Sequence, residues 1–87
     1  MRKYIRLYGA VQGVGLRYRA EHAANHFGVT GYVENCFDGS VEMELEGDEA
    51  SIDQVILAIE RGTFVRIENM TAKTIPEQGS RYFEIRG

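Results

Sequence analysis

The feature that most constrains the fold of this chain is a glycine-rich segment, residues 9–17, which joins a strand pattern directly to a helix pattern. Residues 3–9 alternate between apolar and polar side chains, as a half-buried β-strand does. From residue 16 to residue 27, apolar side chains recur at spacings of four, three and four, which places them on one face of a helix. The chain must therefore turn sharply from a strand into a helix, and glycine permits the backbone conformations that such a turn needs.

The same segment has the composition of an anion-binding turn. The N–H groups in the first turn of a helix have no partner within the helix and point in one direction. Glycines let a ligand approach these groups closely. Arg17 adds a planar, permanently charged guanidinium that matches two phosphate oxygens. These residues fit a phosphate or carboxylate cradle, and they also fit an ordinary tight turn with a solvated arginine.

The middle of the chain predicts two strands and a second helix. Gly28 ends the first helix, and residues 29–36 read as a strand. A hairpin turn at Asp38-Gly39 leads to a third strand, residues 41–45, in which apolar residues alternate with glutamates. The second helix begins at Ser51, with Asp48 as an alternative cap, and ends at Gly62. Its apolar face consists of Ile52, Val55, Ile56 and Ile59.

The remainder predicts two more strands and completes the fold class. The fourth strand starts near Phe64, and its alternation changes phase between Ile67 and Met70, which predicts a β-bulge or an irregular edge. After a turn at residues 76–80, residues 82–86 form a short fifth strand. We therefore expect an α+β, ferredoxin-like βαββαβ sandwich, with two helices on one face of an antiparallel sheet and an extra short C-terminal strand. We interpret residues 1–87 as one domain, and the position of the fifth strand stays open.

Charge and cysteine content exclude several classes of partner. The formal net charge of −3 gives no overall attraction to nucleic acid or to anionic lipid. No apolar run is long enough to span a bilayer, and the N-terminal residues enter a strand pattern without the apolar region of a signal peptide. The single cysteine, Cys36, cannot form an intramolecular disulfide. We expect a cytoplasmic monomer with no membrane or nucleic-acid partner.

Two segments of the chain resemble the acylphosphatase family. Residues 11–17, VQGVGLR, resemble the signature loop of that family, V-Q-G-V-x-F-R. Residues 31–35 (GYVEN), residues 39–41 (GSV) and Gly47 resemble its second signature, in the expected order and spacing. Two signatures at a matching separation are far more specific than one glycine-rich loop. The resemblance is to the small, single-domain acylphosphatases of the bacterial type.

This resemblance implies a hydrolase that cleaves small acyl phosphates to a carboxylate and inorganic phosphate. In the family, the arginine and the loop amides hold the phosphate, and the asparagine positions the attacking water, whose proton goes to a phosphate oxygen of the substrate. Carried onto this sequence, the catalytic residues are Arg17 and Asn35. The resemblance implies no metal or cofactor, and it implies that inorganic phosphate or sulfate competes with the substrate. The implied phosphate site consists of Gln12, Gly13, Val14, Gly15, Leu16 and Arg17.

The sequence departs from the family pattern at two positions. Leu16 replaces the usual Phe or Met, which is a conservative apolar change. Glu34 stands where Arg, Lys, Gln or a small residue is usual. Strand alternation places Glu34 on the opposite face from Asn35, but a negative charge near a phosphate site can still raise KM. We therefore expect activity and leave the catalytic efficiency open.

Other polar residues have plainer interpretations. Asn35 itself follows Val33 on the face directed at the helices, and an asparagine at a strand end can also be satisfied by backbone. His22 and His26 are four residues apart on one helix, a spacing that can hold zinc, but no third ligand accompanies them. We interpret them as part of a polar helix face, and Cys36 as a strand-end thiol without chemistry. We interpret the row Glu42, Glu44 and Glu46 as the solvated face of the sheet.

Two binding functions remain as alternatives to catalysis. Tyrosines on the open face of a ferredoxin-like sheet are typical of RNA-recognition domains, which stack bases there. The three glutamates share that face and would repel a phosphate backbone, and no RNP-type run occurs. The second alternative is an acylphosphatase-like regulatory module that binds phosphate with little turnover. Hydrolysis of a small acyl phosphate, with inorganic phosphate as competitor, distinguishes all three. The tyrosines concerned are Tyr4, Tyr8, Tyr32 and Tyr82.

Overall fold

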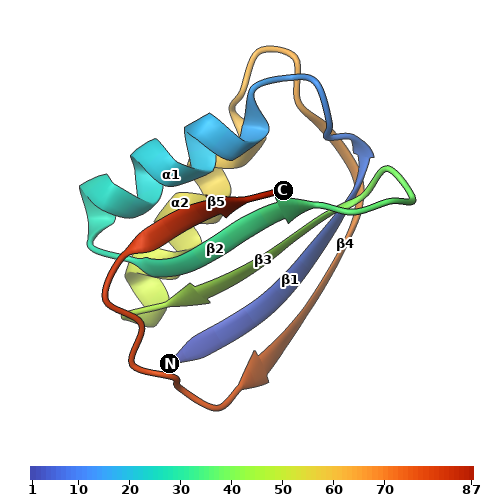
Figure 1. Cartoon of the computed structure of the whole chain (residues 1–87). Coiled ribbons are helices and arrows are strands. Elements are labelled where there is room, and N and C mark those ends of the chain that lie inside the picture. Colours follow the sequence, from blue (N-terminus) through green and yellow to red (C-terminus); the bar gives the residue numbers. More distant parts are fainter.

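The computed structural model describes residues 1–87 as five strands and two helices (Figure 1). Both helices have twelve residues, and neither is long and apolar enough to cross a membrane. The element order is that of the split β-α-β sandwich with one added strand, as the sequence predicts. In chain order the elements are β1 (Arg2–Ala10), α1 (Leu16–Phe27), β2 (Thr30–Asn35), β3 (Val41–Glu46), α2 (Glu49–Glu60), β4 (Arg66–Ile75) and β5 (Phe83–Arg86).

One sheet with the strand order β4-β1-β3-β2-β5 forms the first layer, and α1 and α2 lie together on one of its faces (Figure 1). The pairs β1–β3, β1–β4 and β2–β3 are antiparallel. The extra strand β5 pairs in parallel with β2, with Val33 opposite Ile85. The antiparallel sandwich with an added strand is thus confirmed, and the added strand occupies the edge next to β2.

The hydrophobic core lies between the sheet and the helices. Alternate residues of β1 and β3 point into it, and the helices contribute small side chains from α1 and branched ones from α2. This placement follows directly from the period of two in the strands and of 3.6 in the helices. Fully buried members include Ile5, Leu7, Ala20, Ala24, Val33, Val41, Met43, Leu45, Ile52, Val55 and Ile59.

The predicted irregularity in the fourth strand is a β-bulge. Tyr8 pairs with Asn69 and Gly9 pairs with Ile67, so Glu68 is an additional residue on β4. Gly9 has φ +128°, and a Cβ atom there would lie 2.3 Å from the carbonyl oxygen of Arg66, so only glycine fits. The bulge therefore requires the backbone of β1 at Gly9 to lie very close to the backbone of β4 at Arg66, which the change of phase in the sequence did not indicate.

Several element boundaries differ from those expected. The fourth strand begins at Arg66, and Phe64 lies in a turn before it, because alternation alone cannot separate a strand from the apolar residues that precede it. The second helix begins at Glu49, so Asp48 occupies the N-cap position in place of Ser51, although its side chain forms no capping hydrogen bond. It ends at Glu60, two residues before Gly62. Val29 and Cys36 lie just outside β2.

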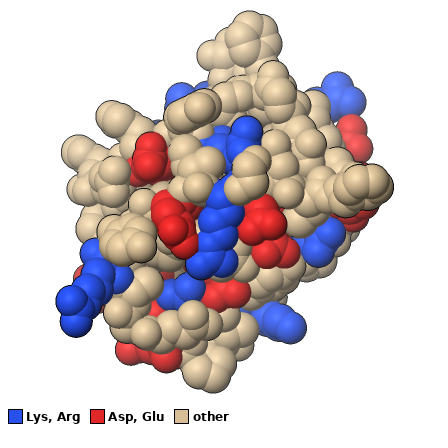
Figure 2. All heavy atoms as spheres, viewed as in Figure 1, with Lys and Arg blue, Asp and Glu red and all other residues tan.

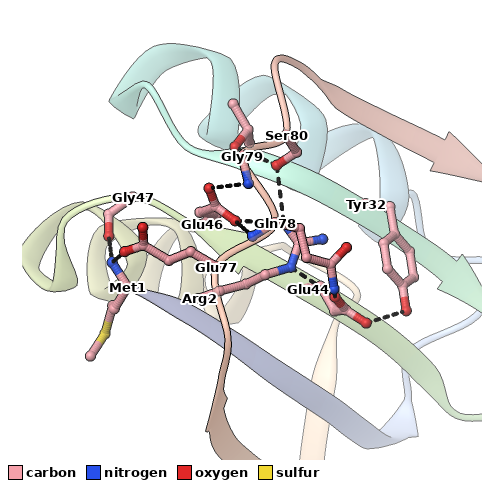
Figure 3. A network of polar contacts seen from close by, with 11 residues as sticks. Met1, Arg2, Tyr32, Glu44, Glu46, Gly47, Glu77, Gln78, Gly79 and Ser80 are labelled. Atoms are coloured by element: carbon pink, nitrogen blue, oxygen red, sulfur yellow. Dashed lines mark hydrogen bonds and ion pairs between the residues drawn. The ribbon is translucent and has the colours of Figure 1, made fainter.

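The open face of the sheet is not the solvated glutamate row that we expected. The glutamates of β3 are paired, and acidic and basic side chains lie beside each other across this face (Figure 2). Arg2 is only 3% exposed, and its guanidinium contacts Glu44 at 2.8 Å and Glu46 at 2.9 Å (Figure 3). Because β1 and β3 are neighbours, the arginine on one strand reaches the two carboxylates on the other.

The same network holds two of the four tyrosines named for an RNA-binding interpretation, Tyr4 and Tyr32. The hydroxyl of Tyr32 donates to Glu42 at 2.9 Å, and the guanidinium of Arg86 lies 4.0 Å from the centre of its ring. Burial, with the hydrogen bond to Glu42, raises the pKa of the Tyr32 hydroxyl. The hydroxyl of Tyr4 also donates to Glu42. The Tyr32 ring is thus covered by an arginine and edged by carboxylates, which disfavours base stacking on this face.

Candidate active site

A pocket of about 160 Å³ lies where the end of β1, the start of α1 and the end of β2 meet. Strands β1 and β2 both run antiparallel to β3, so they are parallel to each other and end at the same side of the sheet. The segment after β1 and the last residue of β2 therefore come together, although they are about twenty residues apart in the sequence. The lining residues are Val11, Gly13, Gly15, Leu16, Arg17, Tyr18 and Asn35.

The glycines give this segment the shape of an anion cradle. Gly13 and Gly15 have φ values of +72° and +75°, in the left-handed region that other residues avoid. Gly15 is the N-cap of α1 and supplies no side chain to cap it. The N–H groups of residues 13–15 donate to no backbone carbonyl, and those in the first turn of α1 have no partner within the helix. Several donors at a helix N-terminus are thus available to an anion.

Arg17 is the only charged residue that lines the pocket. It belongs to the first turn of α1, and its guanidinium forms no ion pair with any carboxylate side chain of the protein. Its Nη1 atom donates to the main-chain oxygen of Gly87 at 3.0 Å. Because β5 runs parallel to β2, the residue after β5 reaches the same side of the sheet as the pocket (Figure 1). The remaining N–H groups of the guanidinium are left for a ligand.

Asn35 closes the pocket from the end of β2. It pairs with Val41 and shares a strand face with the buried Val33, as alternation predicts. Its Oδ1 atom is buried and has no hydrogen-bond partner, and no other buried side-chain nitrogen or oxygen in the protein is in that state. A buried acceptor without a partner costs about 1–3 kcal/mol. The backbone does not satisfy this atom, so the purely structural interpretation of Asn35 is not supported.

The predicted phosphate-binding residues divide into two groups. Gly13, Gly15, Leu16 and Arg17 line the pocket, together with Asn35. Gln12 and Val14 do not line it. The Gln12 side chain donates to two carbonyls of the β2–β3 turn, whereas Val14 packs against the core.

Tyr18 also lines the pocket and was not predicted from the sequence. It is 71% exposed and follows Arg17 on the first turn of α1. The sequence did contain a signal for this residue. Tyr18 is an aromatic residue next to the signature arginine, and helical spacing places it outside the buried apolar face of α1, where an aromatic side chain is not needed for the core.

The two departures from the family pattern have different surroundings. Leu16 is 2% exposed, and its side chain belongs to the core, so it fills an apolar site as expected. In the register of the sheet, Glu34 lies opposite Glu42 of β3 and opposite Arg86 of β5. Alternation directs its side chain to the open face of the sheet, opposite to Asn35. The carboxylate of Glu34 therefore points away from the pocket.

The histidines lie elsewhere. His22 and His26 line an open groove of about 320 Å³ on α1 with Ala58 of α2, and neither residue borders the Arg17 pocket. The ring of His26 packs edge-on against Phe27, with 4.7 Å between the ring centres. No group of three His, Cys, Asp or Glu side chains is placed to hold a metal ion.

This architecture defines a ferredoxin-like α+β protein with a pocket between a helix N-terminus and a strand end, whose unpaired N–H donors and arginine suit an anion. The model of the acylphosphatase family matches residues 3–85. The chain therefore belongs to the acylphosphatase family, which confirms the resemblance seen in its two signatures. The family assignment makes it a hydrolase of the acylphosphatase type.

Individual relatives agree with this assignment. An acylphosphatase from Caldanaerobacter subterraneus subsp. tengcongensis is 44% identical over 77 residues, which cover 87% of this chain and 86% of that protein. One from Clostridium acetobutylicum is 41% identical over 78 residues, with the same coverage of 87% and 86%. The crystal structure of acylphosphatase from Bacillus subtilis matches with a TM-score of 0.90 at 31% identity and covers 100% of both chains.

Proposed function

We propose that the pocket hydrolyses the carboxyl–phosphate bond of small acyl phosphates, with Arg17 and Asn35 as its catalytic residues. The observation that carries this proposal is the buried Oδ1 atom of Asn35, which has no partner and belongs to the same pocket as Arg17 and the loop glycines. A buried acceptor opposite a set of unpaired donors is suited to hold a polar molecule between them. The proposed occupants are the phosphate group and the water that attacks it.

In this proposal, the phosphate lies against the loop between Gln12 and Leu16, held by main-chain N–H groups and by the fork of Arg17. The Oδ1 atom of Asn35 accepts a hydrogen bond from a water molecule and directs the water's oxygen at phosphorus. The new P–O bond forms as the bond to the acyl oxygen breaks, and the electron pair leaves with the carboxylate. The water's proton passes to a phosphate oxygen, so the protein needs no general base. Positioning and charge stabilisation supply most of the catalysis in such phosphoryl transfers.

The test is the Asn35→Ala variant with acetyl phosphate as substrate. Asn35 acts mainly on the way to the transition state, so kcat should fall by about 10²–10³-fold, or about 3–4 kcal/mol. The inhibition constant for inorganic phosphate should stay within about threefold of the wild type, because the cradle is intact. A thermal melt shows that the variant is folded. Normal turnover by folded Asn35→Ala protein would make the residue structural and contradict the proposal.

The same assay tests the alternative of a binding module. A wild-type chain that binds inorganic phosphate but leaves acetyl phosphate intact would be a phosphate-binding or regulatory protein. We also propose that phosphate or sulfate competes with the substrate, and that the chain functions as a monomer in the cytoplasm. The guanidinium of Arg17 and the unpaired main-chain N–H groups at the pocket support competition by these anions. The unpaired thiol of Cys36 supports a reducing compartment.

A further inference from the structure

The side chain of Gln12 connects the two halves of the site. Its Nε2 atom donates to the carbonyl oxygen of Cys36 at 2.7 Å and to that of Ser40 at 2.9 Å. Gln12 directly precedes Gly13 in the cradle, and Cys36 directly follows Asn35. One amide group therefore joins the segment that would hold the phosphate to the segment that would aim the water.

The β2–β3 turn is already closed without Gln12. The N–H of Cys36 donates to Ser40 O at 2.8 Å, and the N–H of Gly39 donates to Cys36 O at 3.1 Å. Arg6 adds a hydrogen bond from its Nε atom to the Ser40 hydroxyl at 2.9 Å and an ion pair with Asp38 at 3.2 Å. Each of the two carbonyls thus keeps one partner if the Gln12 amide is lost, so the turn should persist.

We propose that Gln12 is a positioning residue that fixes the distance between the phosphate cradle and Asn35. This inference rests on the proposed function, because it assumes that Asn35 aims the attacking water. An error of about 1 Å in the placement of a reacting group can cost about 10²-fold in rate. The amide of Gln12 acts across the gap between the two segments, and its own atoms take no part in the reaction.

The geometry also explains why the residue is a glutamine. Both acceptors are carbonyl oxygens, so the site needs two N–H donors and no charge. A Gln12→Met change keeps the length of the side chain and removes both donors. A Gln12→Glu change places a carboxylate against two carbonyl oxygens, which is repulsive until the carboxyl group is protonated and can donate one hydrogen bond.

The experiment measures kcat and KM for acetyl phosphate, and the inhibition constant for inorganic phosphate, in full-length protein. For Gln12→Met, kcat should fall by about 10–100-fold while the phosphate constant changes by less than about threefold. For Gln12→Glu, kcat relative to the wild type should recover as the pH falls below about 5. The matched control is Gln78→Met, since the Gln78 amide donates to Glu44 on the open face, and its kcat should be unchanged.

A double variant identifies the route by which Gln12 acts. If it acts through Asn35, then Gln12→Met should cost less than about threefold in kcat when added to Asn35→Ala. A further loss of kcat in the double variant as large as that in Gln12→Met alone would overturn the proposal. Wild-type kcat in Gln12→Met, or phosphate binding weakened in parallel with kcat, would also overturn it. Failure of both Gln12 variants to fold would also overturn it, since Gln12 would then be required for the fold. A wild-type chain without turnover would instead contradict the proposed function.

Discussion

At the scale of single residues, the proposed function assigns different tasks to two side chains. Arg17 carries the positive charge of the pocket, and Asn35 supplies a neutral acceptor. In the proposed mechanism, the arginine serves both ground-state binding and transition-state stabilisation, whereas the asparagine contributes only when water attacks the phosphate. Kinetic constants can therefore separate the two roles.

The Arg17→Ala variant should lose binding and turnover together. Hydrogen bonds to charged groups are worth about 1.5–3 kcal/mol, so the inhibition constant for inorganic phosphate should rise by about 10–100-fold, and kcat should fall as well. Arg61→Ala is the matched control, because Arg61 is exposed at the C-terminus of α2 and lines no part of the pocket. Unchanged phosphate affinity in a folded Arg17→Ala protein would exclude Arg17 from the phosphate site.

At the scale of elements, the segment between β4 and β5 is attached to β3 by Glu46. This carboxylate accepts hydrogen bonds from the N–H of Gln78 at 2.8 Å and of Gly79 at 3.0 Å, and it contacts Arg2 at 2.9 Å (Figure 3). The Gln78 N–H, together with Arg2, lowers the pKa of the Glu46 carboxyl below its usual range. These contacts hold residues 78–79 against β3, shortly before the chain enters β5 and pairs with β2.

The lowered pKa predicts an acid-sensitive attachment. A carboxyl whose pKa is lower in the folded state stabilises the fold fully above its unfolded pKa of 4.5, and this stabilisation is lost as the pH falls through the folded pKa. Thermal melts should therefore show a lower Tm for Glu46→Gln than for wild type at about pH 7, and the difference should narrow below about pH 4.5. Glu60→Gln, at an exposed and unpaired position on α2, should show no such convergence. A Tm difference that is constant with pH would contradict the attachment.

At the scale of the whole molecule, the fold brings the ends of three parallel-running strands to one side and places the pocket there (Figure 1). The pocket is lined by one positively charged side chain, that of Arg17, by several main-chain N–H donors and by the amide oxygen of Asn35. No carboxylate, imidazole or thiol lines it. This set of groups suits an anion and offers a metal ion only one amide oxygen among its side chains.

Turnover of acetyl phosphate should therefore persist in EDTA at its full rate. The physical reason is that main-chain N–H groups and a guanidinium bind phosphate oxygens directly. A His22→Ala, His26→Ala double variant is the accompanying control, because both imidazoles lie outside the pocket, and its kcat should stay within about threefold of wild type. Loss of activity in EDTA that a divalent ion restores would contradict this prediction.

What the sequence determined by itself was local. A period of two in β3 and a period close to 3.6 in α1 are visible within a few residues, so the elements, the core residues and the bulge in β4 could be predicted. The two signatures also identified the family and placed Arg17 and Asn35 in one site. Boundaries such as the start of β4 at Arg66 were less accessible, because apolar residues in a turn can continue a strand pattern.

What only the tertiary structure decided depends on contacts between residues far apart in the chain. The parallel pairing of β5 with β2 and the pairing of Arg2 with Glu44 and Glu46 join distant segments. The hydrogen bonds of the Gln12 side chain are also long-range. Both acceptors lie in the β2–β3 turn, and no residue near position 12 indicates where they lie. That the Oδ1 atom of Asn35 has no hydrogen-bond partner can be seen only when the positions of all neighbouring donors are known. Local periodicity reports which face a residue occupies, whereas hydrogen-bond partners are set by the packing of the whole chain.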